Sequence, residues 1–317
     1  MNIIFMGTPQ FAVPSLDIIY KSGYTISAVV TVPDKKKGRG LQFSFSEIKE
    51  YALHNNLPIL QPENLKDETF RDKINSLKPD LIVVVAFRIL PKDIFTIPGF
   101  GSINLHASLL PKYRGAAPIN RAIINGEKET GVTTFFLKES IDTGNIILQK
   151  KISIEENDDA GILHDKLSVL GAEAVLETVR LIEDNKVELI TQDEKLVSSA
   201  PKIFKEDCII NWESSSENLF NFIRGLSPYP AAYTYLHGKM IKIFKVLRSE
   251  FILNAEPGRI IIKDKKLYAG TKDFPVEILE LQIEGKKRIS AAEYINGLRN
   301  AADYSAENSS VKFSNYI

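Results

Sequence analysis

The first 130 residues alternate short apolar runs with stretches of helical periodicity, and this alternation constrains the fold more than any other feature. Continuous β-prone runs occupy Asn2–Met6, Ile26–Thr31 and Leu81–Ala86, and amphipathic stretches lie between them. The run LIVVVA at Leu81–Ala86 is apolar at every position, as expected for a strand that is buried on both faces. This β-α-β-α order predicts an α/β fold with a mostly parallel, doubly wound, Rossmann-like sheet.

Capping residues and helix breakers set the expected bounds of the individual elements. Ser46 is a suitable cap for a helix at Glu47–Asn55, and the helix at Asp67–Leu77 should stop before Lys78-Pro79. Further helices are expected at Phe11–Tyr20, Ala116–Asn125 and Asp159–Asn185, and further strands at Leu57–Leu60, Gly101–Leu105, Gly131–Leu137 and Ile146–Ile154.

The pattern changes in the last third of the chain. Thr191–Asp207 is polar, contains Pro201 and has little periodicity, so we interpret residues 190–207 as a linker between domains 1–189 and 208–317. After a short helix at Ser216–Gly225, β-prone runs are broken by glycine-containing turns, which predicts a small, OB-like β-barrel. Six aromatic residues are expected in the core or at a domain interface: Trp212, Phe220, Phe222, Tyr229, Tyr233 and Tyr235.

Composition excludes several classes of protein. Forty basic residues balance forty acidic ones among 317, so binding to a polyanion would depend on local patches. A single cysteine excludes an internal disulfide framework, and the four histidines do not have metal-ligand spacing, so no metal cofactor is expected. The chain begins directly with a strand and contains no apolar run of membrane-span length. We therefore expect a cytoplasmic protein with no membrane partner, and a monomer.

Asn104, His106 and Ser108 are spaced two residues apart at the end of a predicted strand. Side chains at this spacing project to the same side of a strand, so an amide, an imidazole and a hydroxyl would be presented together. An amide can donate to a developing oxyanion, and an imidazole can carry a proton. Asp142, in the stretch SIDTGN, could orient the imidazole. The same stretch is favourable turn chemistry, so spacing alone leaves both roles open.

Two groups of basic residues are candidates for contact with nucleic acid. Lys35, Lys36, Lys37 and Arg39 lie in a segment, KKKGRG, that we expect to be a flexible loop after the second strand. Lys202 and Lys205 lie in the predicted linker. Such residues either contact phosphates or are simply solvated, and the sequence alone leaves both possibilities open. Gly7-Thr8-Pro9 follows the first strand but is neither GxGxxG nor a P-loop, which argues against a dinucleotide site.

Several segments resemble a known family. MGTPQFAVPSL, NLHASLLPKYRGAAPINRAI, TGVTTFFL and IDTGNIIL resemble, in order and spacing, the catalytic domain of formyltransferases that use 10-formyltetrahydrofolate. SAPKIFKEDCIINW and LSPYPAAYT resemble the linker and second domain of the members of that family that act on methionyl-tRNA. The resemblance covers nearly the whole chain. The SLLPKYRG block is specific for folate-dependent formyl transfer and less specific for the acceptor amine.

This resemblance implies transfer of the formyl group of 10-formyltetrahydrofolate to the α-amino group of methionyl-initiator tRNA, for translation initiation. It implies catalytic roles for Asn104, His106 and Asp142, and folate contacts at Ser108, Leu109, Leu110 and Pro111. It also implies that the second domain binds tRNA, with further tRNA contacts expected at Lys35, Lys36, Lys37, Arg39, Lys202 and Lys205.

The chain departs from the family pattern in two places. AFRILP, with Arg88, replaces the more usual AYGLILP at the expected rim of the pterin pocket, and LQFSFSEIK follows the basic cluster where more lysines are usual. Two alternatives stay open at this point. One is a formyltransferase for a sugar nucleotide or another small amine. The other is a non-catalytic RNA-binding protein, which would bind RNA without any dependence on folate.

Overall fold

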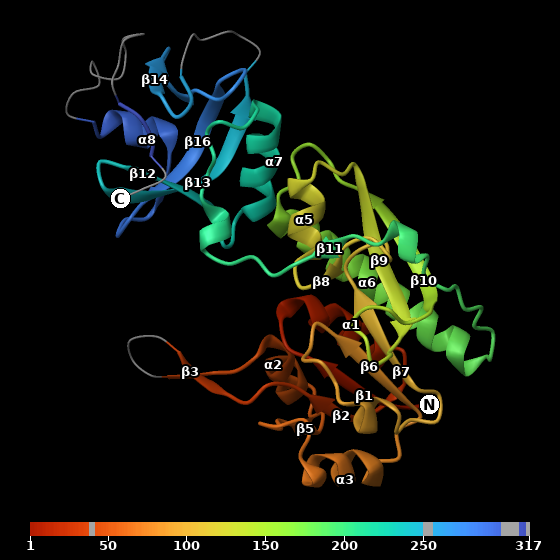
Figure 1. Cartoon of the computed structure of the whole chain (residues 1–317). Coiled ribbons are helices and arrows are strands. Elements are labelled where there is room, and N and C mark those ends of the chain that lie inside the picture. Colours follow the sequence, from red (N-terminus) through yellow and green to blue (C-terminus); the bar gives the residue numbers. More distant parts are fainter. Residues whose placement is uncertain (38–41, 250–255, 299–310, 315–317) are drawn as a thin grey trace. The chain divides into compact units, whose positions relative to one another are not determined.

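The structure is a computed structural model that describes residues 1–37, 42–249, 256–298 and 311–314 (Figure 1). The chain divides into two compact units. The first unit contains Met1–Pro118, Glu129–Ser153 and His164–Ala200, and the second contains Ile119–Lys128, Ile154–Leu163 and Pro201–Ile317. Each unit is described separately below.

A seven-stranded sheet forms the centre of the first unit, in the order β10-β9-β7-β6-β1-β2-β5. Its strands are β1 (Asn2–Gly7), β2 (Thr25–Val30), β5 (Ile59–Leu60), β6 (Leu81–Val85), β7 (Ser102–His106), β9 (Glu129–Phe136) and β10 (Ile146–Ser153). The five strands from β5 to β7 are parallel, while β9 runs antiparallel to β7 and β10 antiparallel to β9. The prediction of a mostly parallel sheet is confirmed.

The helices of the first unit are α1 (Val13–Lys21), which follows a 3₁₀ turn η1 (Gln10–Ala12), α2 (Glu47–His54), α3 (Glu68–Ser76), α4 (Lys92–Phe95) and α6 (Ala160–Glu183). The first four residues of α6 belong to the second unit. Apart from α4, which was not predicted, these helices begin within two residues of their expected starts. The Ser46 hydroxyl accepts a hydrogen bond from Lys49 N at 3.2 Å, and the Asp67 carboxylate accepts one from Thr69 N at 3.0 Å. Each side chain satisfies a backbone N–H that the helix itself leaves free.

Helices cover both faces of this sheet. Phe70 and Ile74 of α3 and Ile94 of α4 pack in one buried cluster with residues of β1, β2 and β6 (Figure 1). On the other face α6 approaches β7 closely, since a Cβ added at Gly171 would lie 2.6 Å from Leu105 Cδ2. The sheet is therefore doubly wound, as predicted.

Two short strand pairs and a 3₁₀ turn complete the first unit. Strands β3 (Lys35–Lys37) and β4 (Gln42–Ser44) form an antiparallel hairpin, so the start of the expected flexible loop is strand instead. Strand β8 (Arg114–Gly115) pairs in parallel with β11 (Ser199–Ala200), and a 3₁₀ turn η2 (Glu194–Leu196) precedes β11. Residues 190–200, the first part of the predicted linker, thus form regular contacts within this unit.

The second unit is built on an antiparallel sheet of order β12-β13-β16-β15-β14, with β17 on β16. Its strands are β12 (Ala232–Leu236), β13 (Lys239–Arg248), β14 (Ile260–Lys263), β15 (Lys266–Ala269), β16 (Val276–Ile283) and β17 (Arg288–Ser290). Residues 311–314 hydrogen-bond to Gly258 and Ile260 on one side and to Tyr235 on the other, so they link the two edges of the sheet. The sheet closes on itself, which agrees with the predicted small barrel.

The helices of the second unit are α5 (Pro118–Ile124), α7 (Ser216–Leu226) and α8 (Ala291–Asn296), and a 3₁₀ turn η3 (Glu206–Cys208) precedes α7. The first residue of α5, Pro118, belongs to the first unit. Leu219, Ile223 and Leu226 of α7 pack into a core shared with the sheet. The indole of Trp212 stacks on the ring of Phe313 in the same core, with 5.1 Å between ring centroids.

Six aromatic residues were expected in the core or at a domain interface, and five of them lie in or against the core. Trp212 and Tyr233 are buried, and Phe220, Phe222 and Tyr235 are half-buried against the core. Tyr229 is 82% exposed and is not part of the core. It lies in the loop between α7 and β12, between Pro228 and Pro230, and outside the periodic pattern that would direct its ring inward.

Candidate active site

The order of strands reverses at β1 and β6, because the chain proceeds from β1 through β2 to β5 on one side and through β6 to β7 on the other. Open α/β sheets bind ligands at the carboxyl ends of the strands next to such a reversal. The ends of β1 and β6 approach closely, since Gly7 pairs with Val85 and a Cβ on Gly7 would lie 3.1 Å from Val85 O. The loops after β1, β6 and β7 therefore lie along one edge.

Asn104 and His106 project from β7 at this edge. Leu105 faces α6, so its neighbours Asn104 and His106 project from the opposite face of the strand. Asn104 is half-buried, and within the part of the chain that the structure describes its carboxamide has no hydrogen-bond partner. Its N–H groups are free to bind an oxygen of a ligand.

The imidazole of His106 is held between two oxygen atoms. Its side chain is only 7% exposed, and Nε2 lies 2.8 Å from the carbonyl oxygen of Tyr113. Because a carbonyl can only accept, Nε2 carries a proton and donates it. The other nitrogen, Nδ1, lies 3.7 Å from Oδ2 of Asp142. Both ring nitrogens therefore face an oxygen atom, which fixes the orientation of the ring.

Asp142 lies in the turn between β9 and β10. Its Oδ2 accepts a hydrogen bond from Gly115 N at 3.0 Å, and its backbone has a left-handed φ of +54°. Two residues later, a Cβ on Gly144 would lie 1.7 Å from Phe136 O, so only glycine lets the turn pack this closely. The structure thus brings Asp142 to His106, while its catalytic role stays a prediction.

The four residues expected to contact folate form a firmly held segment. Ser108 and Leu110 are buried, while Leu109 and Pro111 are half-buried. The Ser108 hydroxyl donates to Lys112 O at 2.6 Å, so it is already engaged within the protein.

Thr133 and Gln149, on β9 and β10, hold this segment in place. The Thr133 hydroxyl donates to Ser108 O at 2.6 Å and accepts from Leu110 N at 3.1 Å. The Gln149 amide donates to Leu110 O at 2.8 Å. Sequence reasoning missed both residues, because each lies on a strand that gave only an apolar or alternating signal.

Arg88, one of the departures from the family pattern, links two loops through its guanidinium. Its guanidinium donates to Pro62 O at 2.7 Å and to Glu63 O at 2.9 Å, which ties the loop after β6 to the segment after β5. Burial lowers the pKa of this guanidinium. The side chain therefore fixes the loop that borders the expected pterin pocket.

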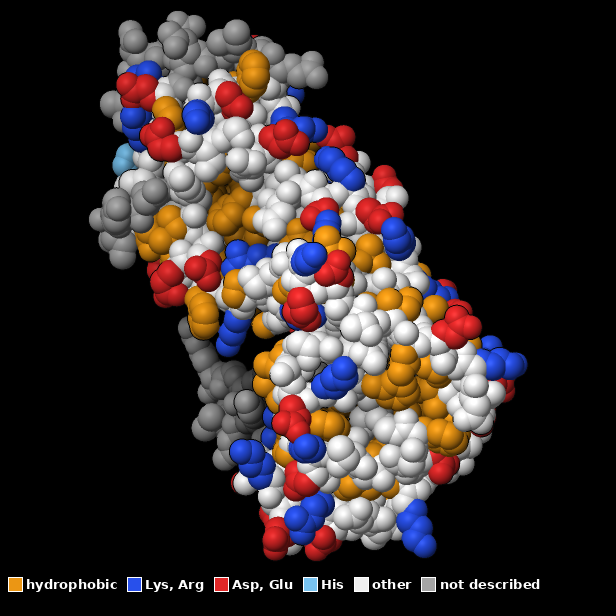
Figure 2. Space-filling view, turned by 45° about the vertical axis from the view of Figure 1, so that its right-hand side comes forward, with side chains coloured by type: hydrophobic (Ala, Val, Ile, Leu, Met, Phe, Trp, Pro, Cys, Tyr) orange, Lys and Arg blue, Asp and Glu red, His pale blue; other side chains and the backbone are white. Residues whose placement is uncertain are grey.

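The basic residues expected to contact tRNA lie in both units. Lys35–Lys37 form β3, whose hairpin extends from the sheet in Figure 1, and Arg39 lies outside the described residues. Lys202 and Lys205 are exposed in the second unit. The structure therefore does not bring the two groups together within one unit. Figure 2 shows acidic and basic side chains interspersed on the face it presents, as the balanced composition predicts.

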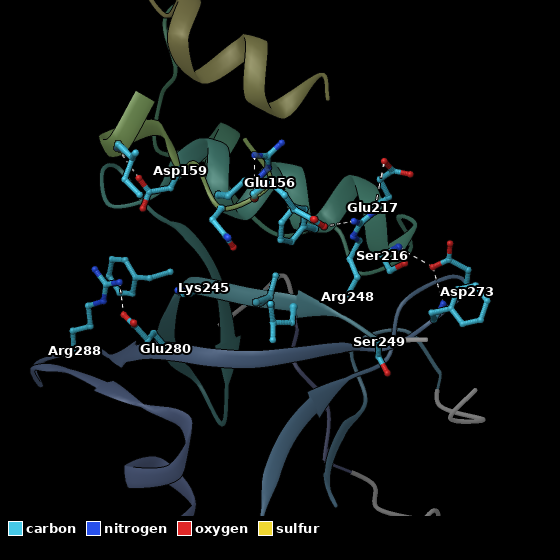
Figure 3. A pocket seen from close by; sticks show the side chains of 18 residues that line it. Glu156, Asp159, Ser216, Glu217, Lys245, Arg248, Ser249, Asp273, Glu280 and Arg288 are labelled. Atoms are coloured by element: carbon cyan, nitrogen blue, oxygen red, sulfur yellow. Dashed lines mark hydrogen bonds and ion pairs between the residues drawn. The ribbon is translucent and has the colours of Figure 1, made fainter. Parts of the chain in front are cut away.

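The second unit contains a pocket of about 820 Å³, lined by α7, β13 and the segment that precedes α6 (Figure 3). Its arginines are engaged within the protein. Arg248 pairs with Glu156, Arg288 pairs with Glu280, and Arg224 donates to the carbonyl of Asp158 at 2.9 Å. The pocket therefore offers little unbalanced positive charge to a phosphate.

Among the residues that the structure describes, no group of three or more His, Cys, Asp or Glu side chains is arranged to hold a metal ion. Within the same part of the chain, every helix is too short or too polar to cross a bilayer.

Comparison with known families gives a consistent result. The family described as "Formyl transferase" matches residues 1–179, and "Formyl transferase, C-terminal domain" matches residues 202–299. A methionyl-tRNA formyltransferase of Flavobacterium johnsoniae is 48% identical over 303 residues, which cover 94% of this chain and 96% of that protein. One of Caldanaerobacter subterraneus is 47% identical over 299 residues, with 94% and 97% coverage.

Solved structures share the fold. The sugar 3N-formyl transferase WlaRD has a TM-score of 0.66 at 24% identity, covering 90% of this chain and 99% of that one. HypX from Aquifex aeolicus in complex with tetrahydrofolic acid has a TM-score of 0.64 at 18% identity, covering 92% and 46%. Together with the high identity along nearly its full length, this places the chain in the formyltransferase family, among the methionyl-tRNA formyltransferases.

Proposed function

We propose that this chain transfers the formyl group of 10-formyltetrahydrofolate to the α-amino group of methionine on initiator tRNA, for translation initiation. The observation that carries the proposal is the arrangement at the end of β7. An unpartnered Asn104 carboxamide lies two residues from a His106 imidazole that faces Asp142 at 3.7 Å. The 48% identity to a methionyl-tRNA formyltransferase selects the acceptor.

Asn104, His106 and Asp142 are the proposed catalytic residues. As an amine attacks a formyl carbon, negative charge grows on the formyl oxygen. The Asn104 amide would donate to that oxygen, and a protonated His106, whose two ring nitrogens face Tyr113 O and Asp142, would stabilise it by its positive charge, in a site where burial excludes much of the water. Asp142 would hold the imidazole in one orientation and favour its cationic form, and it could accept the amine proton through a water.

Ser108, Leu109, Leu110 and Pro111 are the proposed folate contacts. The structure fits this role, because Thr133 and Gln149 fix the segment while the apolar side chains of Leu109 and Pro111 stay partly accessible to a flat ring. The folate supplies the activated formyl group. The chain's own residues bind it, orient it and restrict the access of water.

We propose domains at 1–189 and 208–317, the second domain binding tRNA, with a linker at 190–207 whose first part, residues 190–200, packs within the first unit. Lys35, Lys36, Lys37, Arg39, Lys202 and Lys205 would contact phosphates, which position a nucleic acid without reading its sequence. The overall charge is balanced, so these local groups would have to supply the attraction. Since its tRNA substrate is used in translation, the enzyme would act in the cytoplasm, and we propose that it acts as a monomer.

A formylation assay with three acceptors tests the proposed function. The acceptors are methionyl-initiator tRNA, methionyl-elongator tRNA and an amino sugar nucleotide, each with 10-formyltetrahydrofolate. We expect the highest kcat/KM with the initiator. A preference for the amino sugar would support the small-amine alternative, and RNA binding without any formylated product would support the non-catalytic one.

A further inference from the structure

The side chain of Gln192 connects a distant part of the first unit to the Asp142 turn. It is only 7% exposed, and it lies fifty residues beyond Asp142 in the sequence. Its amide nitrogen donates to Asp142 O at 2.8 Å and to Gly144 O, also at 2.8 Å. Both N–H bonds of the amide are therefore used to hold the backbone of the turn that carries the proposed catalytic carboxylate.

Arg114 fixes which way the Gln192 amide points. The oxygen of the amide accepts from Arg114 Nε at 3.0 Å and from a terminal guanidinium nitrogen at 2.7 Å. A guanidinium can only donate and the two turn carbonyls can only accept, so the opposite orientation would leave four mismatched contacts. The Glu194 carboxylate accepts a hydrogen bond from the same guanidinium at 2.8 Å, and this hydrogen bond lowers the pKa of Glu194.

Three consecutive residues link this network to the proposed catalytic groups. Tyr113 O accepts from His106, the Arg114 side chain binds Gln192, and Gly115 N donates to the Asp142 carboxylate. Arg114 and Gly115 form strand β8, which pairs with β11 a few residues after Gln192. Strand β8 and the residue before it thus contact both His106 and Asp142.

The turn needs such support, because its geometry is not one that aspartate adopts freely. The left-handed φ of +54° at Asp142 is sparsely populated for residues other than glycine. Without the amide of Gln192, the half-buried carbonyl of Asp142 and the buried carbonyl of Gly144 would lose this donor. The turn could then relax and move the carboxylate away from His106.

We infer that Gln192, oriented by Arg114, is a positioning residue that holds the Asp142 carboxylate against His106. This inference rests on the proposed function, since it takes Asp142 as part of the catalytic set. Gln192 does not touch the reacting groups. It acts through the backbone of the turn.

The test uses two substitutions in the full-length chain. Gln192→Leu removes the amide, and Gln192→Glu keeps its shape and its contact with Arg114 but replaces the two donors with an oxygen that repels the turn carbonyls. We expect both to lower kcat by about 10- to 100-fold, as small misplacements of a reacting group do, with both KM values within about twofold. Unchanged kcat in two folded variants would overturn the inference.

Asp142→Asn provides the reference for a double-mutant cycle. If Gln192 acts through Asp142, adding Gln192→Leu to Asp142→Asn should lower kcat by less than about twofold more. Multiplicative losses would instead show that Gln192 acts by another route and would overturn the inference.

Gln61→Leu is the matched control. Its amide also bridges two oxygens in the first unit, at 2.8 Å each, and we expect its kcat within about twofold of the parent.

A second readout does not depend on activity. The Gly115 N–H donates to the Asp142 carboxylate, so its NMR resonance reports the position of that carboxylate. Gln192→Leu should move this resonance towards its position in Asp142→Asn, and Gln61→Leu should leave it in place. An unmoved resonance would overturn the inference even if the wild-type chain formylated no tRNA. A wild-type chain without formylation activity would contradict the proposed function alone.

Discussion

His106 and Asp142 lie with Nδ1 and Oδ2 only 3.7 Å apart, although thirty-six residues and two strands separate them along the chain. Because β9 runs antiparallel to β7, it ends beside the start of β7, where Leu137 N donates to Ser102 O at 2.8 Å. The residues between β9 and β10 then fold back, so that Asp142 reaches His106 at the end of β7. The carboxylate reaches the imidazole only in a conformation with a left-handed φ. The site thus depends on a constrained turn at the edge of a rigid sheet.

Replacing Asn104 or His106 should remove most of the activity and leave the fold intact. Asn104→Ala and His106→Ala should each lower kcat about 100- to 1,000-fold, which is the usual loss when one group that stabilises an oxyanion is removed. Steady-state kinetics with methionyl-initiator tRNA measures the effect, and circular dichroism checks the fold. His54→Ala, at an exposed position on α2, is the control that should keep full activity. Near-normal turnover in either variant would remove that residue from the catalytic set.

The sequence was sufficient to predict one side of this site. Alternation along a strand places Asn104 and His106 on the same face whatever the rest of the fold does. The contribution of Asp142 could not be predicted from spacing, because IDTGN is equally good turn chemistry and in fact forms a turn. Its approach to His106 depends on the register of β7 with β9, which no local pattern specifies.

The role of the supporting residues could not be predicted from the sequence for a related reason. Gln192 falls in a polar stretch without periodicity that predicted a linker, yet it is buried within the first unit. Its partners lie fifty and seventy-eight residues away. The grouping of Ile119–Lys128 and Ile154–Leu163 with the second unit likewise follows from long-range packing. Hydrophobic patterns report which face of an element is buried, but not which distant element covers it.

Neutralising the basic hairpin should weaken tRNA binding without affecting the chemistry. Changing Lys35, Lys36, Lys37 and Arg39 to glutamine should raise KM for tRNA and leave kcat nearly unchanged. A plot of log KM against log salt should become flatter by about 0.7–0.9 for each phosphate contact that is lost. Substituting exposed lysines elsewhere in the first unit, at Lys66, Lys73 and Lys186, should leave the slope as it was. An unchanged slope in the hairpin variant would mean that these residues are only solvated.

Arg224 should be essential for the stability of the second unit. This guanidinium is 8% exposed and donates to Glu155 O at 3.0 Å and Asp158 O at 2.9 Å. Arg224→Met would remove the buried guanidinium donor from both carbonyls, while Glu155 O keeps its hydrogen bond from Asp158 N, and should lower the free energy of unfolding by about 2–3 kcal/mol. Urea denaturation followed by fluorescence of Trp212, the sole tryptophan, measures the change within this unit.

Arg288→Met is the matched comparison for Arg224. Arg288 pairs with Glu280 but is 41% exposed, so its loss should change the free energy of unfolding by less than about 1 kcal/mol. Equal losses from the two variants would mean that burial of the Arg224 guanidinium does not set its contribution.

Asp273 should make the stability of the second unit depend on pH. Its carboxylate accepts from Ser216 N, at the start of α7, and from Phe274 N, each at 2.7 Å. Burial alone would raise the pKa of Asp273, but these hydrogen bonds outweigh it and hold the pKa below the ordinary 3.8. A carboxyl with a lowered pKa in the folded state stabilises the protein at pH values above its pKa in the unfolded chain, and this contribution disappears as the pH falls through the pKa of the folded state.

Asp273→Asn keeps an acceptor but removes the charge next to the helix terminus. The side chain is exposed, so the difference from wild type should be only about 0.5–1 kcal/mol at pH 7 and should vanish progressively below about pH 4. Trp212 fluorescence in urea series between pH 3 and pH 7 measures this difference, and a gap that stays constant across that range would show that the Asp273 charge contributes nothing to the second unit.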